Sequence, residues 1–570
     1  MLSVLVCSAG LAQQPPAPNA ATGPASGMEA ETVPDPALET GPEAALETSR
    51  AKVPMLCTPD ARIGAILVER VNVFDLEDVE ADVEGRFYRL VNLLHRPMLS
   101  RPETIRSLLA LEVGEPCDWE RLEEAERILR SFSFVQDAWI DAEERHGDLV
   151  TVRARVQDAW STRLAVSIRS EGGVTTRSAR VREVNLLGTG ASLAFGRSED
   201  QDRTEKTFEY EHPALGEERW RVGLDLEDNS DGDLQRVRVR RPFYTLDERW
   251  AVDGFVDNVE RDEKVYVGSE EVDRWRLDGT GGLLEYGWSP RGYREGRLER
   301  WRVRLGYDEQ RWWPTFAGST VQRPDLRPVD RERVLAGLRA EWWDVDFRRV
   351  SFVNTARRVE DLDLGRLLTL GADIALPALS DDSGGRLFAA FHEGFELSGT
   401  GFLQINAAHE IEQVGGRWID ALTRFEGRLY LKPTGLQTLY FRILAARGDA
   451  LSGHRRFLLG GDTGLRAYES RAFSGERLLL LTAEHRFFST WELGQLMRVG
   501  LVGFVELGGA WDSGTRFSSE LMHPGVGIGL RGLVLPSSGG TTLHLDVAFP
   551  LDDEGGEDRI RVSFRAQRSF

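Results

Sequence analysis

The chain shows two different hydrophobic periodicities, one after the other. Apolar residues recur at helical spacing almost only between residues 77 and 131, most clearly in the segment Trp119–Ser131. From about Trp160 onward, apolar and polar residues alternate in short segments that Gly, Asp, Ser and Pro separate. Alternation with a period of two indicates strands whose two faces meet different surroundings. The pattern therefore predicts a small unit containing helices, followed by a long run of β-strands.

The first unit mixes strand-like and helix-like segments. The predicted strands are Ile63–Phe74, Phe134–Ala142 and Leu149–Gln157, and the predicted helical segments are Leu76–His95, Arg101–Leu111 and Trp119–Ser131. Asp118 directly precedes the last helical segment, where its carboxylate can accept from the first free backbone amides. We therefore predict one small α+β domain over residues 57–158.

The rest of the chain, residues 159–570, predicts a transmembrane β-barrel. Counted from residue 160 it holds 411 residues (570 − 160 + 1), far more than one soluble β-sandwich of about 100 residues. No run of 18 or more apolar residues follows the N-terminus, but a barrel strand needs only every second residue to be apolar. If about 16 antiparallel strands share this tract, each strand with its connection takes roughly 26 residues, enough to cross a membrane.

The N-terminal residues predict export from the cytoplasm. Residues 1–12 form an apolar run ending in small residues, similar to a secretory signal peptide that lacks its basic start. Residues 13–56 are rich in Pro, Ala and Glu and are predicted to be a disordered linker. Cys57 and Cys117 follow. In an oxidising compartment these two could form a disulfide, and two buried thiols are the alternative.

Charge and motifs argue against several function classes. The formal net charge of −21 argues against a nucleic-acid-binding surface, because phosphate contacts need clustered Lys and Arg. Neither a Gly-x-Ser-x-Gly elbow nor a His-Glu-x-x-His zinc motif occurs in the sequence. We therefore predict no catalytic residue, cofactor or metal site, while a barrel-borne enzyme with scattered rim residues stays an alternative.

Two opposite charges lie among apolar residues in the C-terminal part of the chain. A hairpin with Pro433 in its turn is short enough to face the periplasm, which places residues 448–475 on the extracellular side. Arg466 lies in that loop. In the strand that begins at Met497, apolar residues share one face, so Glu506 lies on the lumenal face. We predict that Arg466 and Glu506 form a lumenal ion pair that holds the loop inside the barrel, the alternative being separate hydration.

The last predicted strand, Arg559–Phe570, has the clearest alternation in the chain. Val562, Phe564 and the terminal Phe570 share an apolar face, and polar side chains occupy the other. This pattern, ending on an aromatic residue, resembles the recognition signal of outer-membrane barrel proteins. A soluble edge strand would give similar alternation, but it would not need to end on Phe570.

Two regions resemble one bacterial family. The order of strands and helices in residues 57–158, with Leu122–Arg130 leading into Phe134, resembles a polypeptide-transport-associated (POTRA) domain. The turn-like segment Val184–Gly190 and the barrel tract resemble single-POTRA members of the BamA/TamA outer-membrane family. This resemblance implies a location in the bacterial outer membrane, with the POTRA domain in the periplasm.

The family motifs also point to particular residues. The family's lumenal loop motif is similar to Gly460, Gly461, Arg466 and Tyr468, and its partner strand motif is similar to Phe504, Glu506 and Gly508. The chain departs from the family pattern twice. Alanine stands at Ala467, where glycine is usual, and Glu506 stands where aspartate is usual.

The resemblance implies a function without covalent catalysis. A protein of this type assists the insertion of proteins into the outer membrane, or their translocation across it. It would use strand addition at the POTRA domain and a lateral seam between the first and last barrel strands. The implied partners are outer-membrane lipid, unfolded outer-membrane or secreted polypeptides, and periplasmic accessory proteins. A pore resembling two-partner-secretion translocators is the alternative, although those usually bring two POTRA units and a plug helix.

Overall fold

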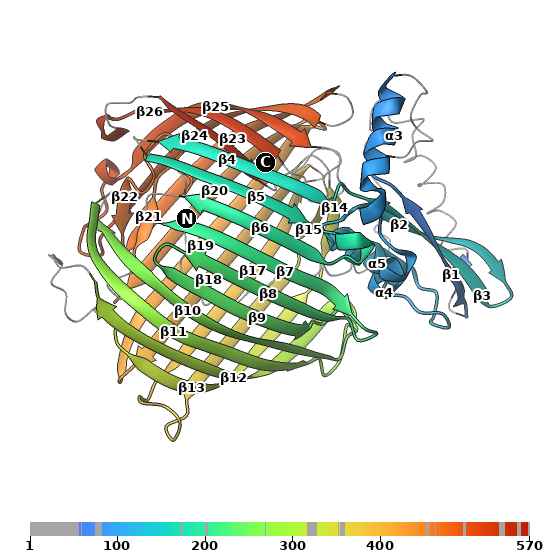
Figure 1. The fold of residues 1–570 in the computed structure, drawn as a ribbon, viewed down its shortest axis with the longest axis horizontal. Helices are drawn as coiled ribbons and strands as arrows, with labels where there is room; N and C mark the ends of the chain where they lie inside the picture. The colour runs from blue at the N-terminus through green and yellow to red at the C-terminus, as the bar shows by residue number, and fades with distance from the viewer. Residues whose placement is uncertain are drawn as a thin grey trace.

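The structure is a computed structural model that describes residues 56–567 except 59, 75–82, 172–173, 200–202, 268–269, 316–327, 351–352, 354–359, 399, 452–454, 462, 494–496, 535–541 and 556–559. A large β-barrel and a smaller α/β unit make up these residues, and the smaller unit lies against one end of the barrel (Figure 1). The predicted signal segment 1–12, nearly all of the predicted linker 13–56 and the terminal Phe570 lie outside the described residues.

The N-terminal α/β unit has the order of strands and helices that the sequence predicts. Its elements are β1 (Arg62–Val71), α3 (Val83–His95), a 3₁₀ turn (Arg96–Met98), α4 (Pro102–Leu108), α5 (Trp119–Ser131), β2 (Val135–His146) and β3 (Leu149–Asp158). The sheet order is β1-β3-β2, with β1 parallel and β2 antiparallel to β3. The Asp118 carboxylate accepts from the Glu120 amide and caps α5. The apolar stripe of α5, with Leu122 and Ile128, is buried in the core of this unit.

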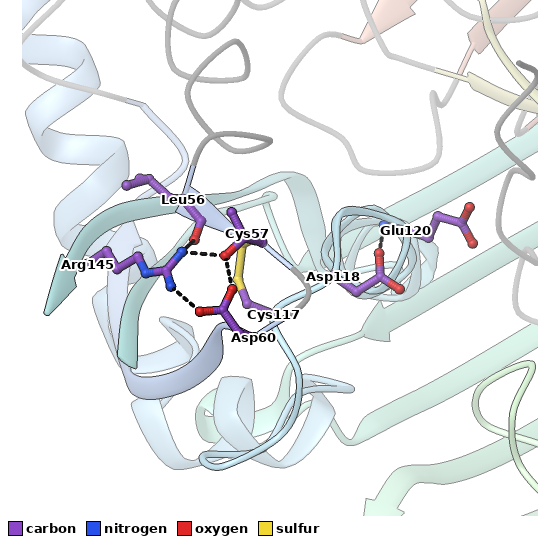
Figure 2. Close-up of a disulfide and its surroundings, with 8 residues drawn as sticks. Leu56, Cys57, Asp60, Cys117, Asp118, Glu120 and Arg145 are labelled. Carbon is purple, nitrogen blue, oxygen red and sulfur yellow. Dashed lines mark hydrogen bonds and ion pairs between the residues drawn. A yellow bond between two sulfur atoms is a disulfide. The ribbon is translucent and has the colours of Figure 1, made fainter. Parts of the chain in front are cut away.

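A disulfide fastens the start of the unit. Cys57 and Cys117 are bonded to each other, so the structure has the first of the two arrangements that the sequence left open (Figure 2). The bond joins the segment before β1 to the segment before α5, 60 residues further along. Arg145 of β2 closes the same corner: its guanidinium donates to Thr58 and lies 2.8 Å from the Asp60 carboxylate.

The barrel is closed, and each strand pairs with its neighbours in the order of the chain. Its strands are β4 (Thr162–Glu171), β5 (Val174–Glu183), β6 (Ser192–Glu199), β7 (Thr204–Leu215), β8 (Trp220–Asn229), β9 (Gly232–Arg241), β10 (Trp250–Val267), β11 (Glu270–Trp288), β12 (Arg297–Pro314), β13 (Arg331–Asp344), β16 (Arg366–Ala375), β17 (Gly385–Ser398), β18 (Gly401–Val414), β19 (Arg417–Thr434), β20 (Gln437–Asp449), β23 (Arg477–Leu493), β24 (Met497–Trp511), β25 (His523–Val534), β26 (Thr542–Pro550) and β27 (Arg561–Gln567). The last strand, β27, lies next to the first, β4, and closes the barrel. Two short hairpins stand apart from the wall: β14 (Phe347–Val350) with β15 (Glu360–Asp363), and β21 (Phe457–Leu459) with β22 (Phe473–Gly475).

The predicted antiparallel barrel is confirmed, but the predicted number of strands is wrong. The described residues place 20 strands in the closed barrel, where 16 were expected. Sixteen strands would have given each strand with its connection an average of about 26 residues. The strands from β4 to β9 have only 8 to 12 residues each, and residues 230–231 alone connect β8 to β9. Six strands therefore fit into residues 162–241.

The two faces of the barrel wall differ in chemistry. On β24, Leu501 and Val505 are 50% and 54% exposed on the outer face, whereas Phe504 and Glu506 on the inner face are buried. On the next strand, Ile528 is 67% exposed. Large apolar side chains that stay exposed on adjacent strands suit contact with lipid. None of the helices in the described part of the chain is long and apolar enough to cross a membrane.

The N-terminal unit rests on turns at one rim of the barrel. The hydroxyl of Thr104 donates to the carbonyl of Gly188, in the turn between β5 and β6, at 2.8 Å. Gly188 has a φ of +74°, and a Cβ there would lie 2.3 Å from the carbonyl oxygen of Leu99. Between β9 and β10, the buried Tyr244 donates to the carbonyl of Leu108 at 2.6 Å. These contacts place the unit on the side of the rim that β5, β6, β9 and β10 form.

Candidate functional site

A loop between β20 and β23 folds back into the barrel. We call residues 450–476 the lumenal loop. Its hairpin β21–β22 lies at the end of the barrel opposite to the N-terminal unit (Figure 1). Leu465, Ala467 and Tyr468 of this loop are fully buried, in one cluster with inward-facing residues of β23, β24 and β26.

Glycines shape the turn that carries the central arginine. Gly464 has a φ of +114°, which glycine adopts at little cost. The amide of Leu465 donates to the carbonyl of Gly460 at 2.9 Å, and the amide of Gly461 donates to the carbonyl of Glu469 at 3.0 Å. A Cβ on Gly460 would lie 2.0 Å from that same Glu469 oxygen. The returning part of the loop therefore passes too close to Gly460 for any side chain.

Arg466 lies at the centre of a buried set of ion pairs. Its Nε donates to one carboxylate oxygen of Glu506 at 2.6 Å, and its backbone amide donates to the other oxygen at 2.8 Å. Its Nη2 donates to Glu484 at 2.7 Å, and its Nη1 lies 3.7 Å from Asp546. The guanidinium carbon lies 3.5 Å from the centroid of the Phe504 ring, a cation–π contact. The structure thus brings Arg466 and Glu506 together in the lumen, as the sequence predicts.

Two further arginines complete the set. Arg486 donates to the second oxygen of Glu484 at 2.9 Å, and Arg531 donates to Asp546 at 2.5 Å. We call these six residues the Arg466 cluster: Arg466, Glu484, Arg486, Glu506, Arg531 and Asp546. Its three positive and three negative charges balance, and each side chain is at most 9% exposed. Loss of any member would leave an unbalanced charge in this buried set, so the members hold one another in place.

Tyr468 forms a second set of contacts between the lumenal loop and the barrel. Its hydroxyl oxygen lies 2.7 Å from the carbonyl oxygen of Pro524 on β25 and 2.9 Å from the carboxylate of Asp552. The ring is fully buried and meets Phe473 edge-on, with the ring centroids 5.3 Å apart. Two residues therefore hold the loop, and they bind different strands. Arg466 binds β23, β24 and β26, whereas Tyr468 binds β25.

Ala467 fits where the family resemblance leads one to expect glycine. It is not among the described non-glycine residues with positive φ, so its methyl group costs no backbone strain. A Cβ added to Gly525 on β25 would lie 2.7 Å from the Cβ of Ala467. The glycine of the wall thus leaves the space that the alanine of the loop occupies.

Gly508, on the inner face of β24, has a similar role beside the loop. A Cβ there would lie 3.0 Å from side-chain carbons of both Leu459 and Leu480. Leu459 belongs to β21 of the lumenal loop and is fully buried. The absence of a side chain at Gly508 therefore lets the base of the loop approach the wall.

Sequence reasoning found two of the six cluster members and missed the others. The signal that could have found them is the alternation of their own strands. On β26, the buried residues Thr542, His544, Asp546 and Ala548 alternate with more exposed ones. A search for charged residues on the inner faces of β23, β25 and β26 would have reached Glu484, Arg486, Arg531 and Asp546.

The residues of the predicted C-terminal signal lie apart from this cluster. Val562 and Phe564 on β27 are 52% and 39% exposed on the outer face, while Arg561 points inward and is buried. Within the described residues, no group of three or more His, Cys, Asp and Glu side chains is placed to hold a metal ion.

Comparison with known proteins matches part of the chain to a family. Residues 417–570, which span β19 to β27, match the Omp85 superfamily domain. The strands that carry the Arg466 cluster and the lumenal loop lie within the matched residues. No curated protein matches the sequence.

Several solved structures align with most of this chain at low sequence identity. BamA from Haemophilus ducreyi lacking POTRA domains 1–3 is 12% identical, with 88% of this chain and 84% of that chain covered and a TM-score of 0.37. CdiB from Acinetobacter baumannii is 10% identical, with 90% and 74% covered and a TM-score of 0.45. CdiB from Escherichia coli is 11% identical, with 93% and 97% covered and a TM-score of 0.45.

Proposed function

We propose that this chain, whose residues 417–570 match the Omp85 superfamily domain, inserts polypeptides into the bacterial outer membrane. In this proposal residues 57–158 are a single POTRA domain in the periplasm. The observation that carries the proposal is the Arg466 cluster. It ties a loop from the far end of the barrel to the inner wall of β23 to β26, close to the seam between β27 and β4.

Insertion needs a strand edge that can open toward lipid. In the described residues the seam lies between β27 and β4, the last and the first strands of the closed barrel. An opened edge exposes backbone groups that lipid cannot satisfy, and a client strand that adds to the edge would satisfy them. No covalent step is needed.

The contents of the lumen favour insertion over a secretion pore. The lumenal loop enters from one end, and a residue of the β14–β15 connection, Val353, is fully buried at the other end against Tyr430 and Tyr440. A pore resembling two-partner-secretion translocators would have to expel both segments before a polypeptide could pass. A client that enters through the seam leaves both in place.

Site-specific cross-linking in living bacteria tests this proposal. A photo-reactive amino acid replaces Leu164 on β4 or Val562 on β27, which are 72% and 52% exposed at the seam. Leu284 on β11, 57% exposed and far from the seam, is the matched control. We expect unfolded barrel precursors to be captured at both seam positions and not at Leu284. Capture of one secreted protein at the inward-facing Gln404, with none at the seam, would instead support the pore.

A further inference from the structure

Two segments that enter the barrel from opposite ends meet at one arginine. The lumenal loop comes from the far end, whereas the β14–β15 hairpin lies at the end beside the N-terminal unit (Figure 1). Arg486 of β23 donates through Nε to Glu484 at 2.9 Å and through Nη1 to the carbonyl of Val353 at 3.1 Å. Glu484 in turn accepts from Arg466. Arg486 therefore connects the residues between β14 and β15 to the other members of the Arg466 cluster.

The hairpin is anchored inside the lumen by apolar packing. Val353 is fully buried in a cluster with Leu362 and Leu364, which come from β15 and the residues after it, and with aromatic residues of the wall. One of these, Tyr440 on β20, also lies under the guanidinium of Arg486, 4.0 Å from ring centroid to carbon. Displacement of the hairpin would uncover this apolar surface and remove an acceptor from Arg486.

The outer part of the hairpin binds helix α5 of the N-terminal unit. Arg349 of β14 donates to Glu126 at 2.9 Å, and Arg130 donates to Asp361 of β15 at 3.4 Å. The guanidinium carbon of Arg127 lies 5.3 Å from the centroid of the Phe347 ring. We call these contacts between α5 and the hairpin the docking contact: Glu126, Arg127, Arg130, Phe347, Arg349 and Asp361.

The docking contact is largely shielded from water. Burial lowers the pKa of Arg127 to about 10 and raises the pKa of the neighbouring Glu124, whose carboxylate accepts from the amide of Leu246 at 2.9 Å. Glu126 is 3% exposed, and it also accepts from Arg130 of its own helix and from the amide of Ile140. In such surroundings removal of one charged partner weakens the contact more than it would at an open surface.

From this geometry we infer that the β14–β15 hairpin couples the position of the N-terminal unit to the Arg466 cluster. Helix α5 binds the hairpin through the docking contact, and the carbonyl of Val353 accepts from Arg486. Arg486 in turn positions Glu484 so that it can accept from Arg466. Arg486 is thus a positioning residue. When a polypeptide bound to the N-terminal unit draws α5 away from the rim, the hairpin loses its outer anchor and the lumenal loop is released more easily. Linkage is reciprocal, so an opened loop also loosens the docking contact.

The coupling does not depend on which class of polypeptide the protein handles. Hydrogen–deuterium exchange on the full-length protein in lipid nanodiscs tests it without any client. Arg349→Ala removes the hairpin's contact with Glu126, and Arg348→Ala is the matched control. Arg348 is the adjacent residue on β14; it is 44% exposed and faces Asp346 and Glu396, away from α5. If Arg349→Ala does not fold, Glu126→Gln removes the same ion pair at nearly constant volume.

We expect Arg349→Ala to speed amide exchange about 10-fold both in α5 with the hairpin and in residues 463–472 of the lumenal loop, within the usual range of coupling between sites. Exchange in β24 and β25 should not change, and Arg348→Ala should leave the lumenal loop unchanged. Faster exchange confined to the hairpin and α5 would overturn the coupling, as would no change at all or an equal effect of Arg348→Ala. A negative result here would leave the cross-linking test of insertion unaffected.

A double variant adds a second check. If Arg349 acts on the loop only through Arg486, then Arg349→Ala combined with Arg486→Ala should speed exchange in the lumenal loop no more than Arg486→Ala alone. If the effects of the two substitutions multiply, Arg349 and Arg486 act on the loop independently. That result would overturn the proposed route.

Discussion

The Arg466 cluster and the docking contact use the same guanidinium–carboxylate chemistry in different settings. Arg466 is 6% exposed and meets carboxylates on three barrel strands whose registers are set by their ladders. Arg349 is 23% exposed and meets Glu126 on a helix of another unit. Ion pairs are hardest to break where water is excluded and the partners cannot move apart. The difference suggests that the cluster is the lasting contact and that the docking contact is released first.

The strongest test of this difference removes a carboxylate from the cluster. In Glu506→Ala, Arg466 loses the acceptor of its Nε and of its backbone amide while it stays buried. We expect opening of the lumenal loop to become easier by about 3–5 kcal/mol. Limited proteolysis of the protein in lipid should then cut the loop quickly. Glu520→Ala, at an exposed glutamate between β24 and β25, is the control and should leave the loop protected. Unchanged protection in Glu506→Ala would mean that the pair does not hold the loop.

A second test weakens the N-terminal unit and spares the barrel. Cys57→Ser combined with Cys117→Ser removes the disulfide that closes a separation of 60 residues. We expect the free energy of unfolding of the N-terminal unit to fall by about 2–4 kcal/mol. Hydrogen–deuterium exchange in α5, measured at increasing denaturant concentrations, gives the loss. The heat-modifiable electrophoretic migration of the barrel is the control. An equal loss of barrel stability would show that the two parts unfold together.

A third test concerns the fit of the loop against the wall. In Gly525→Ala the new Cβ would lie 2.7 Å from the Cβ of Ala467, so we expect the loop to be destabilised by about 1–3 kcal/mol. Ala467→Gly in the same chain should restore loop protection. Gly503→Ala is the matched control, because nothing lies within 4 Å of a Cβ at Gly503. Failure of Ala467→Gly to rescue would show that the two residues do not share this space.

The smallest expected effect comes from an ion pair at the open surface. Lys206 and Asp228 lie 2.7 Å apart, but their side chains are 60% and 73% exposed. Lys206→Ala should change the stability of the barrel by no more than about 0.5 kcal/mol, because water and salt screen the pair. Thermal unfolding of both forms checks this. A loss of stability as large as that in Glu506→Ala would mean that burial does not determine how strongly an ion pair stabilises this protein.

Alternation along the strands supported most of the fold prediction. It predicted a strand that begins at Met497, and β24 begins at that residue. It also placed Glu506 in the lumen. The number of strands was not predictable in this way, because the lengths of turns are not periodic. The tight connections before residue 241 left room for additional strands.

The cluster was only partly predictable. Arg466 and Glu506 were found because each stands alone in an apolar segment. Glu484 and Asp546 have other charged or polar residues nearby in sequence, so nothing local marks them as partners of Arg466. Their meeting depends on strand registers such as Glu484 opposite Phe504 and Asp546 opposite Gly529. These registers bring Asp546 close to Arg466, which lies 80 positions earlier in the chain (546 − 466).

The sequence by itself determined the local features of this protein. The spacing of apolar residues sets helix or strand, the alternation of polar residues sets which face of a strand is wet, and glycines such as Gly464 set where the chain can turn sharply. Only the tertiary structure decided which of these features meet. Closure of the wall into a barrel brings β23 and β26 around one arginine, and docking of α5 on the rim brings Glu126 to Arg349. Such contacts join residues far apart in the chain, so no local pattern encodes them.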